Sequence, residues 1–176
     1  CMEKYTRAEH AILAGADAVI ELPAAFACAP AELFARGAIR LLAALPGFGC
    51  LAFGCESGDE RSFRAAAASA SAESGALKSA IRGRLDSGMS LTRARAEAAA
   101  ETGERAADML SSPNNIHGVE YAKALLAEKS GAALLPVKRV GAAHGEDTLR
   151  SGYSSATAVR RAAAEGRLDD AAESLP

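Results

Sequence analysis

Large side chains are scarce in this sequence. Tryptophan is absent, and aromatic residues make up only 5% of the 176 residues. The hydrophobic fraction of 49% depends heavily on alanine, which accounts for 44 residues and buries little area per residue. The length is sufficient for one domain with a core. Because alanine is the strongest helix former, we predict a helix-rich domain whose core contains few large side chains.

The sequence also lacks the usual features of zinc-binding, secreted and membrane proteins. Its cysteines, Cys1, Cys28, Cys50 and Cys55, have no CxxC spacing and no accompanying histidine cluster. This pattern argues against a zinc site and indicates free thiols in a reducing cytoplasm. No apolar run approaches the roughly 18 residues of a membrane span, and no signal peptide is visible. We therefore expect a cytoplasmic protein with no membrane partner and no metal site of its own.

Strong charge of one sign and the common catalytic motifs are missing as well. There is no Walker-type phosphate loop, no GxSxG and no HExxH. A net charge of −2 does not by itself indicate a nucleic-acid binder. The charge is uneven, however, since residues 1–60 carry a net −4 and residues 132–167 a net +3. Any anionic ligand is expected near the C-terminal third.

Helical patterns and short apolar runs alternate along the chain, without a tight hairpin between successive runs. This alternation predicts βα units around a mainly parallel sheet, and thus an α/β fold in a single domain spanning residues 1–176. A helical insertion is expected at about 58–110, with two or three alanine-rich helices broken by Gly75 and Ser87-Gly88. The other expected helices are 4–14, 30–45, 113–131 and 155–165, and the expected strands are 17–23, 50–54 and 132–140.

Two candidate ligand contacts follow predicted strands, where open parallel sheets bind their ligands. Gly54 ends the run 50–54, and its missing side chain would let a ligand approach the backbone; an ordinary loop glycine is the alternative. Lys138 and Arg139 end the run 132–140. Since neighbouring side chains of a strand point to opposite faces, we expect only one of these two cations to reach a ligand.

The segment "YSSATAVRR", residues 153–161, crowds hydroxyl groups at the start of the last long predicted helix. The first amides of a helix lack internal partners, and the helix dipole attracts anions there. Ser154, Ser155, Thr157 and Arg160 could therefore converge on a polyphosphate. A serine N-cap with a surface arginine explains the same spacing equally well.

Residues 112–118, "SPNNIHG", form another candidate. Asn114 and Asn115 offer donors and acceptors for ribose or base edges, and both residue types also cap helices. His117 is interpreted as a neutral surface or pocket histidine. Five arginines could form a phosphate-tracking face or an ordinary solvated helix surface among neighbouring glutamates: Arg82, Arg84, Arg93, Arg95 and Arg105.

Six segments in one order resemble the bacterial tRNA(Met) cytidine acetate ligase family. They are "KYTRAEHAILAGADAVIELP", "ELFARGAIRLL", "LAFGCESGD", "SPNNIHGVEYAKAL", "PVKRVGA" and "SSATAVRRA". The resemblance covers nearly the whole chain and is weakest across 60–110. It implies a Rossmann-like nucleotidyltransferase fold. It also implies an enzyme that uses ATP, with magnesium, to activate acetate as acetyl-adenylate and then acetylates the wobble cytidine of elongator tRNA(Met).

The resemblance also assigns ATP contacts by position. The family's strand-end glycine matches Gly54, the asparagine of its PNN motif matches Asn114 or Asn115, and its strand-end arginine matches Arg139. The segment "SSATAVR" is similar to the triphosphate-binding turn of related adenylyltransferases. That similarity extends the triphosphate role to Ser154, Ser155, Thr157 and Arg160.

Departures from the family leave other functions open. Nothing before Lys4 resembles the family's first strand and HxGH-like histidine loop, and family members continue past the last predicted helix. No catalytic residue is therefore assigned, and the chain as it stands is expected to be inactive. The missing strand would expose an apolar sheet edge that a second copy could cover. The alternatives are an adenylyltransferase for a small phosphorylated metabolite and a non-catalytic nucleotide- or RNA-binding module.

Overall fold

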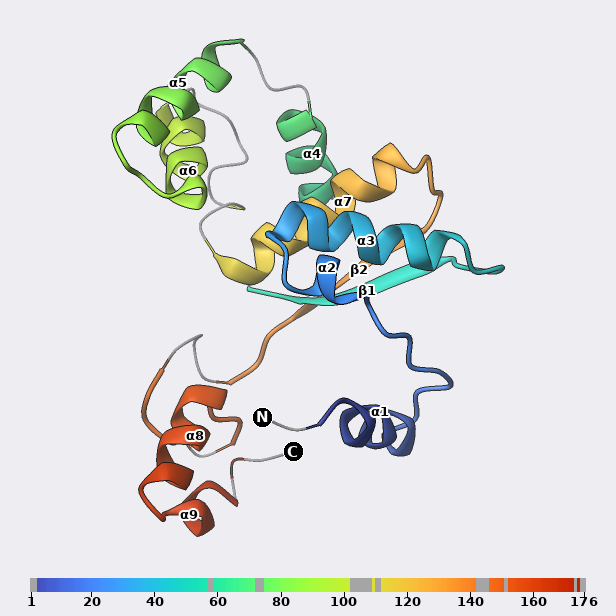
Figure 1. Cartoon of the computed structure of the whole chain (residues 1–176), viewed down its shortest axis with the longest axis vertical. Coiled ribbons are helices and arrows are strands. Elements are labelled where there is room, and N and C mark those ends of the chain that lie inside the picture. Colours follow the sequence, from blue (N-terminus) through green and yellow to red (C-terminus); the bar gives the residue numbers. More distant parts are fainter. Residues whose placement is uncertain are drawn as a thin grey trace.

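A parallel pair of strands lies at the centre of the fold (Figure 1). The computed structural model describes residues 3–56, 59–71, 75–101, 109, 112–141, 146–150, 152–172 and 174. The strands are β1 (Cys50–Cys55) and β2 (Ala133–Lys138). The helices are α1 (Lys4–Leu13), α2 (Ala24–Ala27), α3 (Ala31–Ala43), α4 (Glu60–Ser71), α5 (Gly75–Asp86), α6 (Leu91–Glu101), α7 (Pro113–Ala127), α8 (Ala156–Ala164) and α9 (Leu168–Ala172).

The two strands pair in register from Cys50 opposite Ala133 to Cys55 opposite Lys138. Alternation of side chains gives the pair one covered face and one open face. Leu51, Phe53 and Leu134 face the helices and belong to the core. On the open face, Leu135 and Val137 are each 53% exposed. The predicted α/β fold with a parallel sheet is confirmed.

Helix α7 is the centre of the packing on the covered face. It contacts α3, α4 and β1, and buries Val119, Ala122 and Leu125 completely. Gly118 makes the close approach of α4 and β1 possible. A Cβ atom at this position would lie 2.4 Å from Phe63 Cε1 and 2.5 Å from Phe53 Cε2.

Helices α5 and α6 pack on each other and form a small cluster of their own (Figure 1). Leu77 and Ile81 of α5 meet Ala94 and Ala98 of α6. The predicted break at Ser87-Gly88 is confirmed, since Gly88 adopts a φ of +86° between the two helices. The proposed extent of a helical insertion, about 58–110, stays a prediction, and α4 belongs to the main core.

The strand predicted over residues 17–23 is wrong for this chain. These residues form no helix or strand, and Val19 and Ile20 are 48% and 49% exposed. A strand needs a neighbouring strand for its backbone hydrogen bonds. Within the described residues, β1 pairs with β2 alone, and the apolar run joins neither outer edge of this pair, so it has no ladder partner. The predicted helix before it is present as α1, and Gly15 ends it with a φ of +103°.

Helices α8 and α9 pack together beyond β2 (Figure 1). Their link to the sheet is the segment that follows β2. Gly141 lies so close to this part that a Cβ atom there would be 2.6 Å from the Tyr153 carbonyl oxygen. In the part of the chain that the structure describes, no helix is long and apolar enough to cross a membrane.

Candidate functional site

Arg139 lies over Gly54 at the carboxyl end of the sheet. The Arg139 amide donates a 2.9 Å hydrogen bond to the Cys55 carbonyl oxygen, which continues the parallel ladder past β2. A Cβ atom on Gly54 would have one neighbour within 4 Å, the Arg139 Cγ at an ordinary 3.8 Å. Packing in the described part of the chain therefore does not require glycine at position 54. The open space in front of it is available to a ligand.

Lys138 belongs to the opposite face. It pairs in register with Cys55, whose side chain is fully buried. Burial and then the charge of Glu56 raise the pKa of the Cys55 thiol, while the charge of Lys138 acts to lower it. Of the two cations at this strand end, Arg139 therefore shares the face of Gly54, and its guanidinium has no ion pair within the described residues.

Glu56 closes the amino end of α7. Its carboxylate accepts hydrogen bonds from the Asn115 amide at 3.1 Å, the Ser112 hydroxyl at 3.1 Å and the Asn114 side chain, Nδ2 to Oε1, at 2.6 Å. In return, the Glu56 amide donates to Asn115 Oδ1 at 3.1 Å. This reciprocal arrangement resembles a capping box in which the acid comes from a distant strand.

The hydrogen bonds around Glu56 favour the ionised form of its carboxyl group. Partial burial acts to raise its pKa, but the hydrogen bonds from the Asn114 and Ser112 side chains and from the Asn114 and Asn115 amides outweigh burial. The pKa of the carboxyl group is therefore below its ordinary value. Sequence reasoning did not identify this residue. The available signal was an acid placed directly after a strand end, within the segment "LAFGCESGD".

The two asparagines differ in accessibility. Asn115 is 1% exposed, and its side-chain oxygen is taken by Glu56. Asn114 is partly exposed and stays bound to Glu56 through its Nδ2 atom. His117 belongs to an aromatic group, with its ring 5.7 Å from Phe34 in an edge-to-face contact, and its Nδ1 lies 3.0 Å from the Pro113 carbonyl oxygen.

At the start of α8, the two serines are occupied by the protein itself. Ser155 is the N-cap, its hydroxyl accepts from the Ala158 amide at 3.1 Å, and it also donates to the Glu146 carbonyl oxygen. Ser154 accepts from the Arg150 amide at 2.9 Å. The capping interpretation of these hydroxyls therefore has direct geometric support, and their phosphate-binding role stays a prediction.

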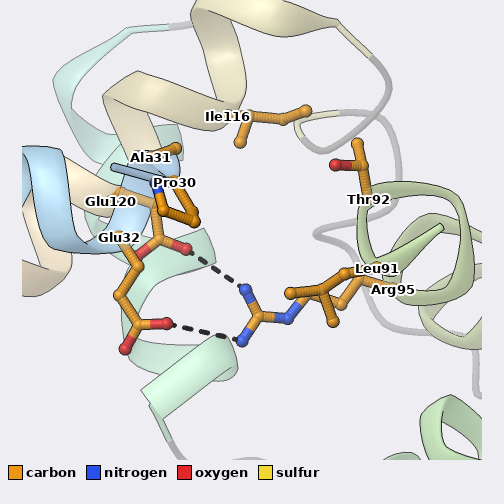
Figure 2. A pocket seen from close by; sticks show the side chains of 8 residues that line it. All are labelled: Pro30, Ala31, Glu32, Leu91, Thr92, Arg95, Ile116 and Glu120. Atoms are coloured by element: carbon orange, nitrogen blue, oxygen red, sulfur yellow. Dashed lines mark ion pairs between the residues drawn. The ribbon is translucent and has the colours of Figure 1, made fainter. Parts of the chain in front are cut away.

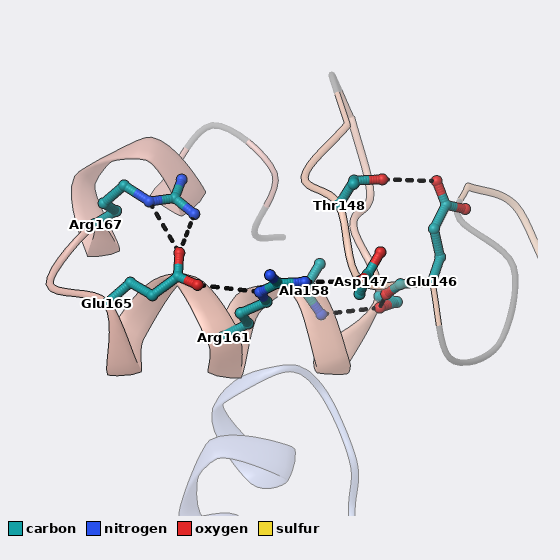
Figure 3. Close-up of polar contacts among 8 residues, drawn as sticks. Glu146, Asp147, Thr148, Ala158, Arg161, Glu165 and Arg167 are labelled. Carbon is teal, nitrogen blue, oxygen red and sulfur yellow. Dashed lines mark hydrogen bonds and ion pairs between the residues drawn. The ribbon is translucent and has the colours of Figure 1, made fainter.

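Thr157 and Arg160 are better placed for a ligand. The Arg160 guanidinium is exposed, and it donates a 3.4 Å hydrogen bond to the Thr157 hydroxyl. No carboxylate of the described residues pairs with it. By contrast, Arg161 binds Asp147 at 2.7 Å and Glu165 at 3.0 Å, and Glu165 also holds Arg167 (Figure 3). Arg160 is thus the arginine of α8 whose charge is free of such pairs.

Gly141 lies against Tyr153. This contact places the loop that follows Arg139 against the residue that precedes Ser154. Arg139 at the sheet end, and the hydroxyl, guanidinium and amide groups at the start of α8, are each suited to an anion. Among the described residues, no group of three or more His, Cys, Asp or Glu side chains could hold a metal ion.

The arginines of α5 and α6 mostly face carboxylates. Arg84 and Arg93 lie 3.8 Å and 2.7 Å from Glu97. Arg95 reaches out of its own helix to Glu32 of α3 at 3.8 Å and to Glu120 of α7 at 3.6 Å, across a hollow between these helices (Figure 2). These pairs favour a solvated helix surface over a phosphate-tracking face. Arg105 lies outside the described residues.

Comparison with known proteins adds an independent line of evidence. A family model described as HIGH Nucleotidyl Transferase matches residues 1–176. The tRNA(Met) cytidine acetate ligase of Clostridium novyi is 38% identical over 162 residues, with 90% of this chain and 40% of the relative covered. The protein of the same description from Syntrophotalea carbinolica is 39% identical over 178 residues, with 99% and 42% covered. The chain thus spans about two fifths of the length of these curated relatives.

Two solved structures share the fold. The apo crystal structure of Thermotoga maritima TmcAL has a TM-score of 0.87 and 32% identity, and covers 99% of this chain and 43% of that chain. The structure of Thermotoga maritima TmcAL bound with alpha-thio ATP has a TM-score of 0.81 at the same identity, with 99% and 42% covered. The predicted resemblance is thereby confirmed, together with the nucleotidyltransferase-like fold.

Proposed function

Because the chain belongs to the HIGH nucleotidyl transferase family, we propose that it holds ATP in a tRNA(Met) cytidine acetate ligase. In this proposal the complete enzyme activates acetate as acetyl-adenylate and acetylates the wobble cytidine of elongator tRNA(Met). The arrangement that carries the proposal is Arg139 lying over Gly54 at the carboxyl end of the sheet, where open parallel sheets bind ligands. The names of the relatives and the bound alpha-thio ATP of one structural neighbour support it.

The phosphate contacts are assigned by charge and accessibility. Arg139 faces the open space at Gly54, and Arg160 with Thr157 would hold the far end of the triphosphate. The Ala156 and Thr157 amides at the start of α8 have no partner within the described residues, so they can add donors to the same oxygens. Ser154 and Ser155 would then position this turn through the hydrogen bonds that they already make. Asn114 is assigned to the nucleoside because it is the more exposed asparagine.

The proposed reaction has two steps. An acetate oxygen attacks the α-phosphorus of ATP, and the bond to pyrophosphate breaks, which gives acetyl-adenylate. The exocyclic amine of the cytidine then attacks the acetyl carbonyl carbon, loses a proton and displaces AMP. Positioning and charge stabilisation are the contributions assigned to this chain, and magnesium is expected to arrive with ATP. The chain spans two fifths of the relatives, and we expect it to bind ATP without turnover on its own.

Neighbouring arginines of α8 provide a matched test of the triphosphate contact. We expect Arg160→Ala to weaken ATP binding about tenfold, since a charged hydrogen bond contributes roughly 1.5–3 kcal/mol. Arg161→Ala removes the same charge, but Arg161 is already paired with Asp147 and Glu165. Because this exposed side chain is engaged by the protein itself, its loss should leave the affinity for ATP within about threefold of the original value. Calorimetric titration with ATP measures both. Equal losses in the two variants would contradict the assignment.

The reaction itself requires a protein of the relatives' full length that carries this chain. Exchange of labelled pyrophosphate into ATP should depend on acetate. Exchange that instead depends on a phosphorylated metabolite would favour the alternative adenylyltransferase. Absence of exchange with any acceptor, alongside intact ATP binding, would favour a non-catalytic module.

A further inference from the structure

The side-chain amide of Asn114 has a fixed orientation in the structure. Its Nδ2 atom donates to Glu56 Oε1 at 2.6 Å. An ionised carboxylate can only accept hydrogen bonds, so the opposite orientation would place the amide oxygen against a negative charge. The same carboxylate is anchored by Ser112 and by the Asn115 amide, which prevents it from following a rotation of Asn114.

This orientation leaves the Asn114 oxygen for a ligand. Oδ1 accepts no hydrogen bond from any residue that the structure describes. No buried side-chain oxygen of the described chain lacks a partner, so this atom is accessible from outside. Asn114 is bound to Glu56, two residues beyond Gly54, which places its free acceptor at the same end of the sheet as Gly54 and Arg139.

An acceptor of fixed polarity selects among nucleosides. A ribose hydroxyl can rotate and pair with either end of an amide, whereas the 6-amino group of adenine only donates and a 6-oxo group only accepts. An amide of fixed orientation can therefore distinguish one base from another, but it does not select at a ribose hydroxyl. We infer that Glu56 is a positioning residue that holds the Asn114 oxygen toward the nucleotide, and so selects a 6-aminopurine over a 6-oxopurine. The inference rests on the proposed ATP site and adds its base specificity.

Paired titrations with ATP and inosine triphosphate test the inference on the chain as it is. These two nucleotides have the same phosphates and ribose. ATP has a 6-amino group and an unprotonated N1, whereas inosine triphosphate has a 6-oxo group and a protonated N1. We expect ATP to bind about tenfold more tightly, the effect of one unmatched hydrogen bond. In Glu56→Gln the new amide can donate to Asn114, so the Asn114 amide can turn its NH2 outward. The affinity ratio should then fall to within about threefold.

Two further variants separate positioning from general damage. Asn114→Ala keeps Glu56 and removes the acceptor, and should lose the discrimination in the same way. Glu60→Gln is the matched control, because Glu60 also begins a helix and accepts hydrogen bonds, from the Leu134 amide at 3.2 Å and from Arg64 at 2.8 Å. It should keep the tenfold ratio. Thermal unfolding checks that each variant is folded.

The outcomes distinguish this inference from the proposed function. Equal binding of the two nucleotides by the original chain, or an unchanged ratio in folded Asn114→Ala, would overturn the base-selection role. An unchanged ratio in folded Glu56→Gln would overturn the positioning role of Glu56. Failure of the original chain to bind ATP would instead overturn the proposed ATP site on which both depend.

Discussion

The polar side chains near the sheet end divide into those that the protein uses internally and those left for a ligand. Ser155 and Asn115 are buried and bonded within the chain. Among the described residues, Arg139 and Arg160 pair with no carboxylate, and the side-chain oxygen of Asn114 accepts no hydrogen bond. Residue type alone does not separate these groups, because both contain an asparagine. What separates them is which neighbours the fold supplies.

Glu56 also gives the fold a defined pH dependence. The pKa of Glu56 is below its usual value of about 4.3 in the folded chain. Its contribution to stability is therefore present above pH 4.3 and lost as pH falls through the lower pKa of the folded state. We expect Glu56→Gln to show a smaller decrease in the free energy of unfolding between pH 5 and pH 3 than the original chain. Urea denaturation at several pH values measures it, and parallel curves would contradict the prediction.

Helix α7 depends on the absence of a side chain at one position. Gly118→Ala would place a methyl group 2.4 Å from Phe63 and 2.5 Å from Phe53, and we expect it to destabilise the fold by about 1–3 kcal/mol. This corresponds to a fall in Tm of roughly 3–10 °C for a chain of this size. Gly83→Ala in α5 is the control, because beyond its own turn of helix no atom of the described residues lies within 4 Å of its Cβ position. It should be neutral or stabilising by up to about 1 kcal/mol. Thermal unfolding followed by circular dichroism compares the two, and similar shifts would contradict the packing argument.

Most elements could be predicted from local sequence patterns. Residues 30–45 and 113–131 were expected as helices and are present as α3 and α7, and the apolar run 50–54 is present as β1. The run 17–23 has the same apolar character as 50–54, yet only the latter finds a parallel partner. Apolar patterning predicts that a segment will be buried if it can pair. It does not supply the partner, which is why the first strand was predicted wrongly.

The candidate site was predictable to the extent that it follows strand geometry. Alternation predicts that only one of Lys138 and Arg139 reaches a ligand, and the register seen in the structure puts Arg139 on the face of Gly54 and Lys138 on the other. The cap formed by Glu56 joins residue 56 to residues 112–115, a meeting that no local pattern encodes. Likewise, Ser155 could be recognised as a possible cap from the sequence. Its hydrogen bond to the carbonyl oxygen of Glu146, nine residues earlier, depends on the fold and could not be predicted.

Within the described residues, the helix pairs α5–α6 and α8–α9 each pack together beside the main core, and α1 lies apart from it (Figure 1). The pair α5–α6 has its own apolar cluster, and among the described residues Arg95 links it to α3 and α7 by ion pairs with Glu32 and Glu120. The pair α8–α9 follows the loop beyond β2. The open face of the sheet keeps Leu135 and Val137 half exposed. Coverage of an exposed sheet edge by a second copy of the chain stays a prediction.

Arg95 should control how firmly α5–α6 is held. Arg95→Ala removes the pairs with Glu32 and Glu120, and we expect it to broaden the range of distances between α5 and α3, at a cost of about 1 kcal/mol in overall stability. Spin labels at Ser79 and Arg36, in a chain whose other cysteines are replaced, report those distances. Arg93→Ala is the control, because its partner Glu97 lies on the same helix. A broadening as large in the control would contradict the role of Arg95.

The pairing of Cys50 with Ala133 joins two strands that are far apart in the sequence, so the sheet can form only after both have been synthesised. During synthesis, β1 leaves the ribosome long before β2 exists, and the chain between them has to close a long loop before the ladder begins. Contacts so distant in sequence slow folding. Leu51, Phe53 and the apolar side of α3 therefore cannot be buried in the core until α7 and β2 have been synthesised. During that interval the nascent chain exposes hydrophobic surface that chaperones can bind and that the folded chain buries.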